Sequence, residues 1–242
     1  MRCREKRILA IIFYLAVFFF TTPVACARVV NKSLPAQNTV ILWTDRSLLK
    51  AITLVTIKPG HRPVGIISIP VITRLDGCQK RTLADLYALC GQSELLAYLE
   101  KHFHIPIQTY FSIDQNALSL ASEIIGPLNM KGKKMTMLDV FEGTYADERF
   151  DLEAEIRTIA QKMLEPEVLV KIPRLIRVFT THVDTNLTPF NFFAFYQLLR
   201  WEGPEILRKE VLPGKEGTAE GVPYKEVPPE AWGRVLQNVT QR

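Results

Sequence analysis

Three short runs of apolar, mostly β-branched residues lie close together in the chain, at residues 39–43, 51–57 and 64–69. Each run is followed by residues that favour turns, such as Lys58-Pro59-Gly60 or Pro70. Continuous apolar runs of this kind predict strands of a sheet that is covered on both faces. The rest of the chain must therefore supply two covering layers.

Apolar residues at helical spacing predict these layers. The predicted helices cover residues 82–90, 93–103, 114–126, 153–164, 166–179 and 229–238, with another that opens at Thr188-Pro189. Asp114 is the expected N-cap of its helix. Further strands are expected at 107–113 and 135–140, and a loop at 214–224. This order predicts an α/β three-layer sandwich, in which a mixed central sheet carries helices on both faces.

The first 27 residues resemble a targeting segment. A basic stretch at 2–7 precedes an unbroken apolar run at 8–20, and Ala25-Cys26-Ala27 follows. This pattern predicts a signal peptide that is cleaved before Arg28. An uncleaved membrane anchor and lipidation at Cys26 are the alternatives. All three predict an extracytoplasmic protein with a linker at 28–37 and one domain at 38–242.

Charge and motifs exclude several classes of protein. The net charge is +5, and residues 2–7 alone carry four basic residues against one acidic residue. The predicted domain therefore lacks the positive excess of a typical nucleic-acid-binding protein. The chain has no GxSxG, GxGxxG or GxxxxGK[ST] motif and no CxxC pair. Cys78 and Cys90 are the two cysteines beyond the first 27 residues. They either form a disulfide or remain reduced.

An aromatic segment follows at residues 190–196. Five of its seven residues are aromatic, including Phe190, Phe193 and Tyr196. One interpretation is an ordinary aromatic core. The other is one wall of an apolar slot for an acyl or isoprenoid chain.

Several segments, in order, resemble the LytR-CpsA-Psr family of bacterial cell-envelope proteins. Among them are Ser68-Ile69-Pro70 at the end of the third strand and Leu212-Pro213-Gly214 late in the chain, and the resemblance rests on the order and spacing of the segments together. The matching segments are residues 39–45, 51–57, 65–70, 86–91, 104–110, 122–127, 184–188 and 211–214.

The resemblance implies a function. Members of this family transfer glycopolymers from a polyprenyl-pyrophosphate carrier to peptidoglycan outside the membrane, and their α/β sandwich encloses the isoprenoid chain. The family's chemistry implies cationic clamps and a Mg²⁺ ion on the pyrophosphate. The implied partners are a polyprenyl-linked cell-wall precursor or peptidoglycan, and other envelope enzymes.

This sequence departs from the family pattern at most of the catalytic positions. Asp45 stands where the first aspartate is expected and is the candidate metal ligand, but Lys50 replaces the second aspartate. Val71-Ile72-Thr73 stands where the family has Arg-Asp-Thr. The arginine-rich helix start falls on residues 147–155, which hold Arg149 among five acidic residues. That charge is the wrong sign for a phosphate clamp.

Other cations are candidate substitutes. Asp45 and Arg74 are the candidate catalytic residues, and Arg46, Lys50, Arg81 and Arg149 the candidate phosphate-binding residues; the alternative is that these cations are ordinary solvated residues. Three interpretations follow. The chain is a degenerate family member that binds lipid-linked precursor or acts as an envelope scaffold, an active phosphotransferase with relocated arginines, or a secreted α/β interaction domain with an unrelated partner. The missing clamp favours the first.

Overall fold

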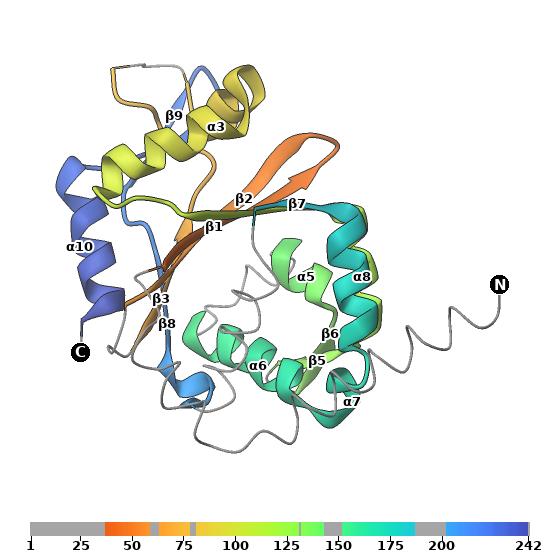
Figure 1. Ribbon diagram of the computed structural model, residues 1–242. Coiled ribbons are helices and arrows are strands. Elements are labelled where there is room, and N and C mark those ends of the chain that lie inside the picture. The colour runs from red at the N-terminus through yellow and green to blue at the C-terminus, as the bar shows by residue number, and fades with distance from the viewer. Residues whose placement is uncertain are drawn as a thin grey trace.

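A mixed six-stranded sheet forms the centre of the molecule (Figure 1). The computed structural model describes residues 37–58, 63–77, 81–130, 132–142, 152–186 and 202–241. The strand order is β7-β4-β1-β2-β3-β8. These strands are β1 (Gln37–Asp45), β2 (Leu48–Ile57), β3 (Val64–Ile69), β4 (Thr109–Asp114), β7 (Val183–Thr185) and β8 (Leu207–Val211). β1 pairs in parallel with β4, and β3 with β8, while the other neighbours are antiparallel. The predicted mixed sheet is confirmed.

Two helices cover one face of this sheet, α3 (Leu83–Phe103) and α10 (Pro229–Thr240). Thr82 and Asp85 form a capping box at the start of α3, and Gly91, with φ of 80°, kinks the helix. α10 packs tightly on β3, because a Cβ at Gly65 would lie 2.6 Å from a methyl carbon of Val239. The core under these helices is one continuous cluster that includes Val40, Leu42, Leu54 and Trp232.

The opposite face carries the helices α4 (Gln115–Ile125), α5 (Met137–Glu142), α6 (Leu152–Leu164), α7 (Pro166–Leu169) and α8 (Ile172–His182). Asp114 caps α4 as predicted, because its Oδ1 accepts a hydrogen bond of 2.7 Å from the Ala117 amide. Side chains of β1 alternate between the two layers: Val40 and Leu42 pack under α3, and Trp43 packs under α4 and α8. The three-layer α/β sandwich is therefore confirmed. None of the described helices is long and apolar enough to span a membrane.

Three local predictions were wrong. Residues 135–140 are not one strand: β5 (Leu128–Met130) and β6 (Lys133–Met135) form a hairpin, and α5 starts where Thr136 and Asp139 cap each other. The predicted loop at 214–224 is instead the hairpin of β9 (Lys215–Ala219) and β10 (Val222–Glu226). Its turn residues Glu220 and Gly221 both have positive φ, as a tight hairpin requires. The single helix predicted at 166–179 is divided into α7 and α8.

An aromatic cluster joins α3, α10 and the segment after β3. The His102 ring lies with its centroid 4.1 Å from that of Tyr98 and 5.0 Å from that of Trp232. Phe103 meets Trp232 edge-on at 5.0 Å. The Nε2 atom of His102 lies 3.5 Å from Asp76 Oδ2, and the Tyr98 hydroxyl accepts a hydrogen bond from the Asp76 amide. Burial lowers the pKa of His102, Asp76 raises it by a smaller amount, and Lys101 and His104 lower it further.

This pKa predicts a pH-dependent stability. Because the pKa of His102 is lower in the folded chain than in the unfolded one, the unfolded chain binds more protons. The free energy of unfolding should therefore fall as the pH drops from about 7 to about 5. Urea unfolding of His102→Gln should show a smaller fall, whereas His182→Gln, at an exposed position on α8, should keep the original one. An unchanged pH slope in His102→Gln would refute this role.

Candidate functional site

The carboxyl ends of four strands meet at one edge of the sheet, called here the carboxyl edge. β1 ends at Asp45, β4 at Asp114, β3 just before Pro70 and β8 just before Leu212. These four strands run in the same direction, since β1–β4 and β3–β8 are parallel and β2 is antiparallel to both β1 and β3. Ligands of α/β sheets commonly bind outside this edge. The predicted residues Asp45, Arg46, Lys50, Arg74 and Arg81 all belong to segments at or beyond it.

Asp45 and Lys50 form an ion pair at the base of the β1–β2 turn. Arg46 and Ser47 make this turn with φ of 48° and 67°, so the chain reverses at once. The Lys50 Nζ lies 4.0 Å from Asp45 Oδ2, and the two side chains are 40% and 30% exposed. Such an exposed pair adds little stability. The pair places a positive charge beside the carboxylate at this position.

The donor set at this edge fits Mg²⁺ poorly. The family resemblance implies two aspartates, whereas Asp45 here has a lysine beside it. Among the described residues, no three His, Cys, Asp or Glu side chains lie close enough together to hold a metal ion. Asp114, the other carboxylate at this edge, is engaged in capping α4. Oxygen ligands are what Mg²⁺ requires, and a neighbouring ammonium group opposes its binding.

Arg74 and Arg81 lie on the segment between β3 and α3. The guanidinium carbon of Arg74 lies 3.7 Å from the centroid of the Tyr224 ring, which holds the side chain against the β9–β10 hairpin. Arg81 is exposed, and its carbonyl accepts a hydrogen bond from the Leu75 amide. The two cations therefore differ, because one is held by an aromatic ring and the other projects into solvent.

The start of α3 is not available to an anion. The amides of Leu83 and Ala84 donate to the carbonyls of Thr73 and Val71, and the Asp85 amide donates to the Thr82 hydroxyl. These are the N–H groups that would otherwise bind a phosphate at a helix N-terminus. Residues 71–73, which stand where the family has Arg-Asp-Thr, thus accept the hydrogen bonds of this helix end through their backbone carbonyls.

The other predicted site residues have separate outcomes. Arg149 and the aromatic residues Phe190, Phe193 and Tyr196 lie outside the described residues. Cys90 is exposed and is a free cysteine, and Cys78, its predicted disulfide partner, lies outside the described residues.

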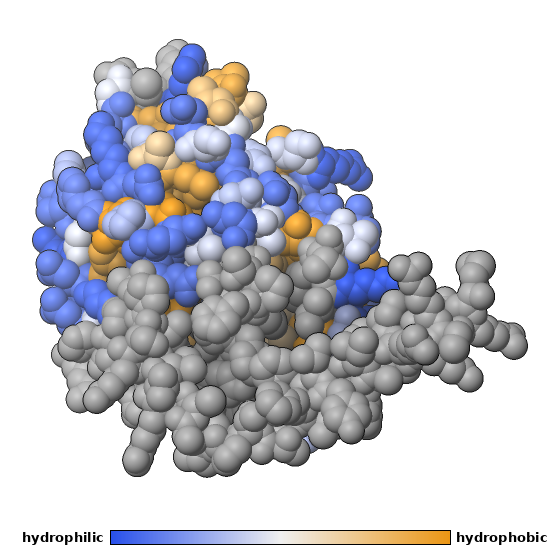
Figure 2. Space-filling model, viewed as in Figure 1, coloured by the Kyte–Doolittle hydropathy of each residue, from blue (hydrophilic) through white to orange (hydrophobic). Residues whose placement is uncertain are grey.

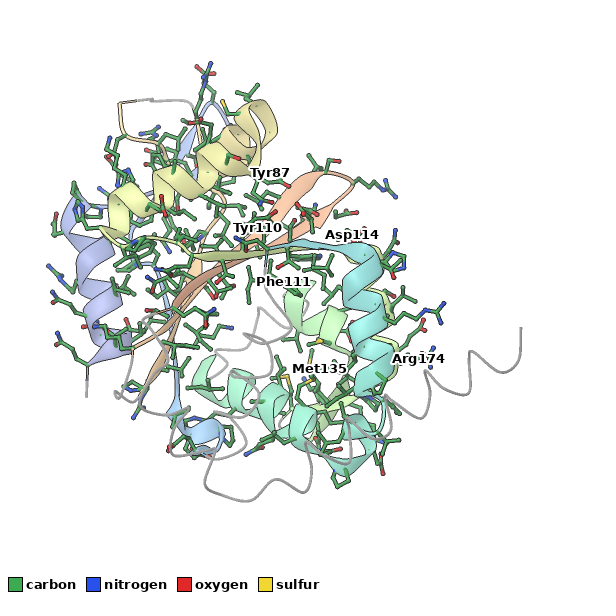
Figure 3. All side chains as sticks on the ribbon, viewed as in Figure 1. Tyr87, Tyr110, Phe111, Asp114, Met135 and Arg174 are labelled. Atoms are coloured by element: carbon green, nitrogen blue, oxygen red, sulfur yellow. The ribbon has the colours of Figure 1, made fainter. Side chains whose placement is uncertain are left out.

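A line of side chains across the sheet was not predicted from the sequence. In register, it runs through Thr185, Phe111, Ile41, Thr53, Ser68 and Val211, one residue from each strand. We call it the cross-sheet row. The first five of these residues are half-buried and Val211 is 38% exposed. Figure 3 shows Phe111 on the side of β4 that faces α5, with Tyr110 on the other side.

The cross-sheet row lies between two apolar clusters, and its Phe111 packs against the first of them. On one side, Trp43 and Ile113 pack against α4, α7 and α8. On the other, Val64 and Ile66 pack against Ala160 of α6 and residues around β8. Ile41, between them, belongs to none of the clusters of buried residues and is only half-buried. On the opposite face of the same strands, Val40 and Leu54 are fully buried.

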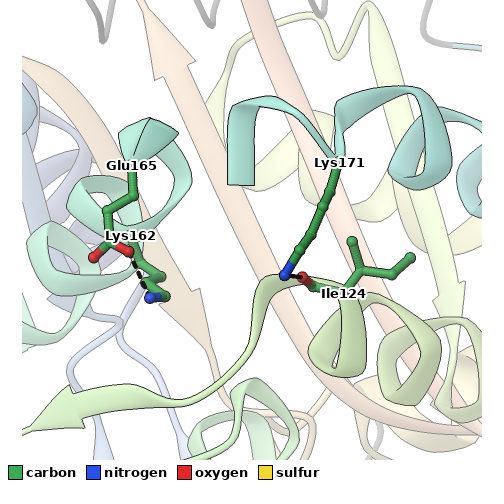
Figure 4. Close-up of polar contacts among 4 residues, drawn as sticks. All are labelled: Ile124, Lys162, Glu165 and Lys171. Carbon is green, nitrogen blue, oxygen red and sulfur yellow. Dashed lines mark hydrogen bonds and ion pairs between the residues drawn. The ribbon is translucent and has the colours of Figure 1, made fainter. Parts of the chain in front are cut away.

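Two lysines in the helical layer opposite the row have structural contacts (Figure 4). The Lys171 ammonium donates to the Ile124 carbonyl at 3.1 Å, which ties the start of α8 to the end of α4. Lys162 pairs with Glu165 at 2.5 Å, where α6 ends and α7 begins. A cation at a helix C-terminus is favourable, so these contacts stabilise the helices that face the row.

Solved structures share this architecture. The chain matches TagV from B. subtilis with a TM-score of 0.66 and 14% identity, over 86% of this chain and 96% of TagV. It matches the Lin1025 protein from Listeria innocua with a TM-score of 0.63 and 16% identity, over 85% and 98% of the two chains. TagT, solved bound to LIIa-WTA, matches with a TM-score of 0.59 and 16% identity, over 87% and 92%.

The chain has the LytR-CpsA-Psr fold. No family model matches the sequence, and no curated protein matches it. At sequence identities of 14–16%, this structural likeness shows a shared fold and nothing further. At its carboxyl edge, this chain has the Asp45–Lys50 ion pair. The first amides of α3 there donate to backbone carbonyls of the preceding segment.

Proposed function

We propose that this chain is an extracytoplasmic cell-envelope protein that binds a polyprenyl-pyrophosphate-linked glycopolymer precursor. In this proposal the isoprenoid chain lies along the cross-sheet row, and the pyrophosphate lies at the carboxyl edge. The protein acts as a binder or scaffold, and normal phosphotransfer is lost. Peptidoglycan or other envelope enzymes would be its further partners.

The observation that carries this proposal is the cross-sheet row itself. A row of six adjacent strands spans about 24 Å, because neighbouring strands lie about 4.8 Å apart. Ile41 and Thr53 are half-buried between the two clusters, and in this proposal the isoprenoid chain covers them. An isoprenoid that lies on this row would bury its apolar surface, which the hydrophobic effect favours.

The row reaches the carboxyl edge at its β3–β8 end. Ser68 is the last residue but one of β3, and Val211 is the last residue of β8. Ile41, in contrast, lies in the middle of β1. An isoprenoid in the row would therefore present its pyrophosphate near Pro70 and the segment that carries Arg74. TagT, of the same fold, is solved bound to LI-WTA and to LIIa-WTA, which supports a ligand of this class.

The charges at the edge argue against efficient phosphotransfer. Departure of a phosphate requires cations and a metal that are aimed at the developing negative charge. Here Asp45 has the Lys50 ammonium beside it, and the first amides of α3 donate to the carbonyls of Val71 and Thr73. Arg74 is the best-placed remaining cation, and it is stacked on Tyr224.

Native mass spectrometry of the full chain in detergent, mixed with a polyprenyl pyrophosphate and Mg²⁺, tests the proposal. The expected result is a complex whose lipid stays a pyrophosphate over time. Formation of the monophosphate would instead support the active transferase with relocated arginines. Absence of any lipid adduct would refute the proposal and favour an interaction domain with an unrelated partner.

The Lys50→Asp substitution tests the poor fit to Mg²⁺. It would replace an ammonium beside Asp45 with a second carboxylate, which restores the pair that the resemblance implies. Reversing the charge beside Asp45 should raise Mg²⁺ affinity by roughly tenfold or more. Isothermal titration of MgCl₂ into the protein measures this change, with Lys215→Asp on β9 as the matched control. Equal affinities for the two variants would contradict the role assigned to Lys50.

A further inference from the structure

The backbone that carries Arg74 is held on both sides. On one side, the Arg74 amide donates a hydrogen bond of 2.9 Å to the Lys225 carbonyl, and the Lys225 amide donates to the Ile72 carbonyl at 2.9 Å. On the other side, the Leu75 amide donates to the Arg81 carbonyl at 2.9 Å. The segment after β3 is thus paired both with β10 and with the residues just before α3. The position of the Arg74 backbone is therefore fixed by the fold.

The Tyr224 ring holds the side chain of Arg74 in turn. The guanidinium carbon lies 3.7 Å from the centroid of the ring, which is a cation–π contact. The ring itself lies on Gly217, which is the partner of Tyr224 across the β9–β10 hairpin. A Cβ at Gly217 would lie 2.6 Å from both the Cζ atom and the hydroxyl oxygen of Tyr224, so a larger residue would displace the ring. Gly217, Tyr224 and Arg74 are therefore in contact in that order.

The guanidinium of Arg74 has no acceptor within the part of the chain that the structure describes. The side chain is half-buried, yet it makes no hydrogen bond or ion pair with any residue there. A cation in such a position has lost part of its hydration without a compensating acceptor. A stacked guanidinium still presents its N–H groups in the plane of the fork, where they match two oxygens of a phosphate.

The charges on the surrounding segments balance. Residues 71–77, Arg81 and the β9–β10 hairpin carry four basic and four acidic side chains: Arg74, Arg81, Lys215 and Lys225, against Asp76, Glu216, Glu220 and Glu226. In register, Glu216 lies opposite Lys225, and Glu226 lies opposite Lys215. The net charge of these segments is therefore zero and does not attract an anion by itself. Any recognition of an anion must come from the geometry of the Arg74 guanidinium.

The place of Arg74 in the fold suits a polar ligand. Its segment continues β3 beyond Ser68, and the hairpin that holds it begins at Lys215, soon after β8 ends at Val211. Ser68 and Val211 form the end of the cross-sheet row that is nearest to the carboxyl edge. At the end of the molecule where Figure 1 places α3 and β9, Figure 2 shows hydrophilic and apolar residues intermingled on the surface.

We propose that the Arg74 guanidinium, held on the Tyr224 ring, is a binding site for a phosphate-type oxyanion. Tyr224 and Gly217 are its positioning residues, because they fix the guanidinium that binds the ligand. Arg74 follows residues 71–73, which stand where the family has Arg-Asp-Thr, so the site differs from the one that the resemblance implies. The identity of the ligand rests on the proposed function, in which the oxyanion is the pyrophosphate of a lipid-linked precursor. A diphosphate that is free in solution has the same chemistry.

Calorimetry with inorganic pyrophosphate and the full chain in detergent, without added metal, tests the site. Arg74→Gln should weaken binding by roughly tenfold or more, because hydrogen bonds between two charged groups are lost. Arg74→Lys should also weaken it, since an ammonium group lacks the planar fork. Arg234→Gln is the matched control, because it removes an exposed arginine from α10, and it should bind as the unmodified chain does.

Three further variants test the positioning residues. Tyr224→Leu should weaken pyrophosphate binding several-fold, whereas Tyr224→Phe keeps the ring and should stay within about twofold of the unmodified chain. Gly217→Ala should weaken binding because its Cβ displaces the ring. Gly233→Ala is its control, since a Cβ there has nothing within 4 Å. Circular dichroism and urea unfolding check that each variant is folded, as expected from backbone hydrogen bonds that do not involve the ring.

Two results would overturn the inference directly. The first is absence of pyrophosphate binding by the unmodified chain, or equal affinities in Arg74→Gln and Arg234→Gln, which would show that Arg74 is not the site. The second is an equal effect of Tyr224→Leu and Tyr224→Phe, which would show that the ring does not position the guanidinium.

Repeating the titration with a polyprenyl pyrophosphate separates this inference from the proposed function. Lipid binding that Arg74→Gln leaves unchanged would overturn the inference and retain the proposed function. Binding of inorganic pyrophosphate that depends on Arg74, without any lipid adduct, would support the inference and refute the proposed function. Tighter binding of the lipid than of inorganic pyrophosphate, with both weakened in Arg74→Gln, would identify the lipid headgroup as the source of the oxyanion.

Discussion

Thr53→Trp is expected to reduce binding of a polyprenyl pyrophosphate by roughly a hundredfold or more. Thr53 lies at the centre of the cross-sheet row, between Ile41 and Ser68, and its side chain is half-buried. An indole there would fill the space that the isoprenoid needs. Excluding a few methylene-sized groups, at about 0.8 kcal/mol each, is enough to cause this loss. Native mass spectrometry or calorimetry with a graded lipid series measures the change.

Thr218→Trp provides the matched control for this experiment. Thr218 is also a strand threonine, but it lies on β9 and is exposed. The control should bind lipid as the parent does. Thermal unfolding of both variants separates a blocked slot from a damaged fold. If a folded Thr53→Trp protein binds as tightly as the control, the isoprenoid does not lie in the row.

Trp232→Ala is expected to lower the free energy of unfolding by about 3–5 kcal/mol, since it removes a large buried aromatic side chain and leaves a cavity. Trp232 is only 2% exposed, and its ring meets those of Phe103, His102 and Tyr98. It thereby joins α10 to α3 over the sheet. Urea unfolding measures the change.

Val222→Ala serves as the comparison for Trp232→Ala. Val222 is 61% exposed, so its truncation should change stability by less than about 0.5 kcal/mol. A loss below about 1 kcal/mol in Trp232→Ala would mean that α10 is not held by this cluster.

The sequence predicted those parts of the fold that depend on local pattern. The apolar run at 64–69 is β3, and Asp114 and Gly126 bound α4 as expected. The hairpin of β9 and β10 was missed, because its strands hold charged and small residues and have little apolar periodicity. α5 was taken for a strand because its cap, Thr136 with Asp139, lies within a short apolar stretch.

The candidate site was less predictable than the fold. Asp45 was expected at the end of its strand, and it is found there. The Asp45–Lys50 pair depends on the tight turn at Arg46-Ser47, which the sequence did not reveal. The Arg74 contact with Tyr224 joins residues far apart in the chain. The cross-sheet row depends on the register of six strands, and the β1–β4 and β3–β8 pairings join segments that are far apart in the chain.

The central claim, that an isoprenoid lies along the cross-sheet row, is tested most directly by photo-crosslinking. A polyprenyl pyrophosphate with a benzophenone near the end of its tail would be irradiated with the full chain, and the labelled peptide sequenced by mass spectrometry. We predict labels on Ile41, Thr53 or Phe111, in the part of the cross-sheet row that crosses β1, β2 and β4. Labels confined to exposed residues such as Leu89 or Val170, with none in the row, would contradict the claim.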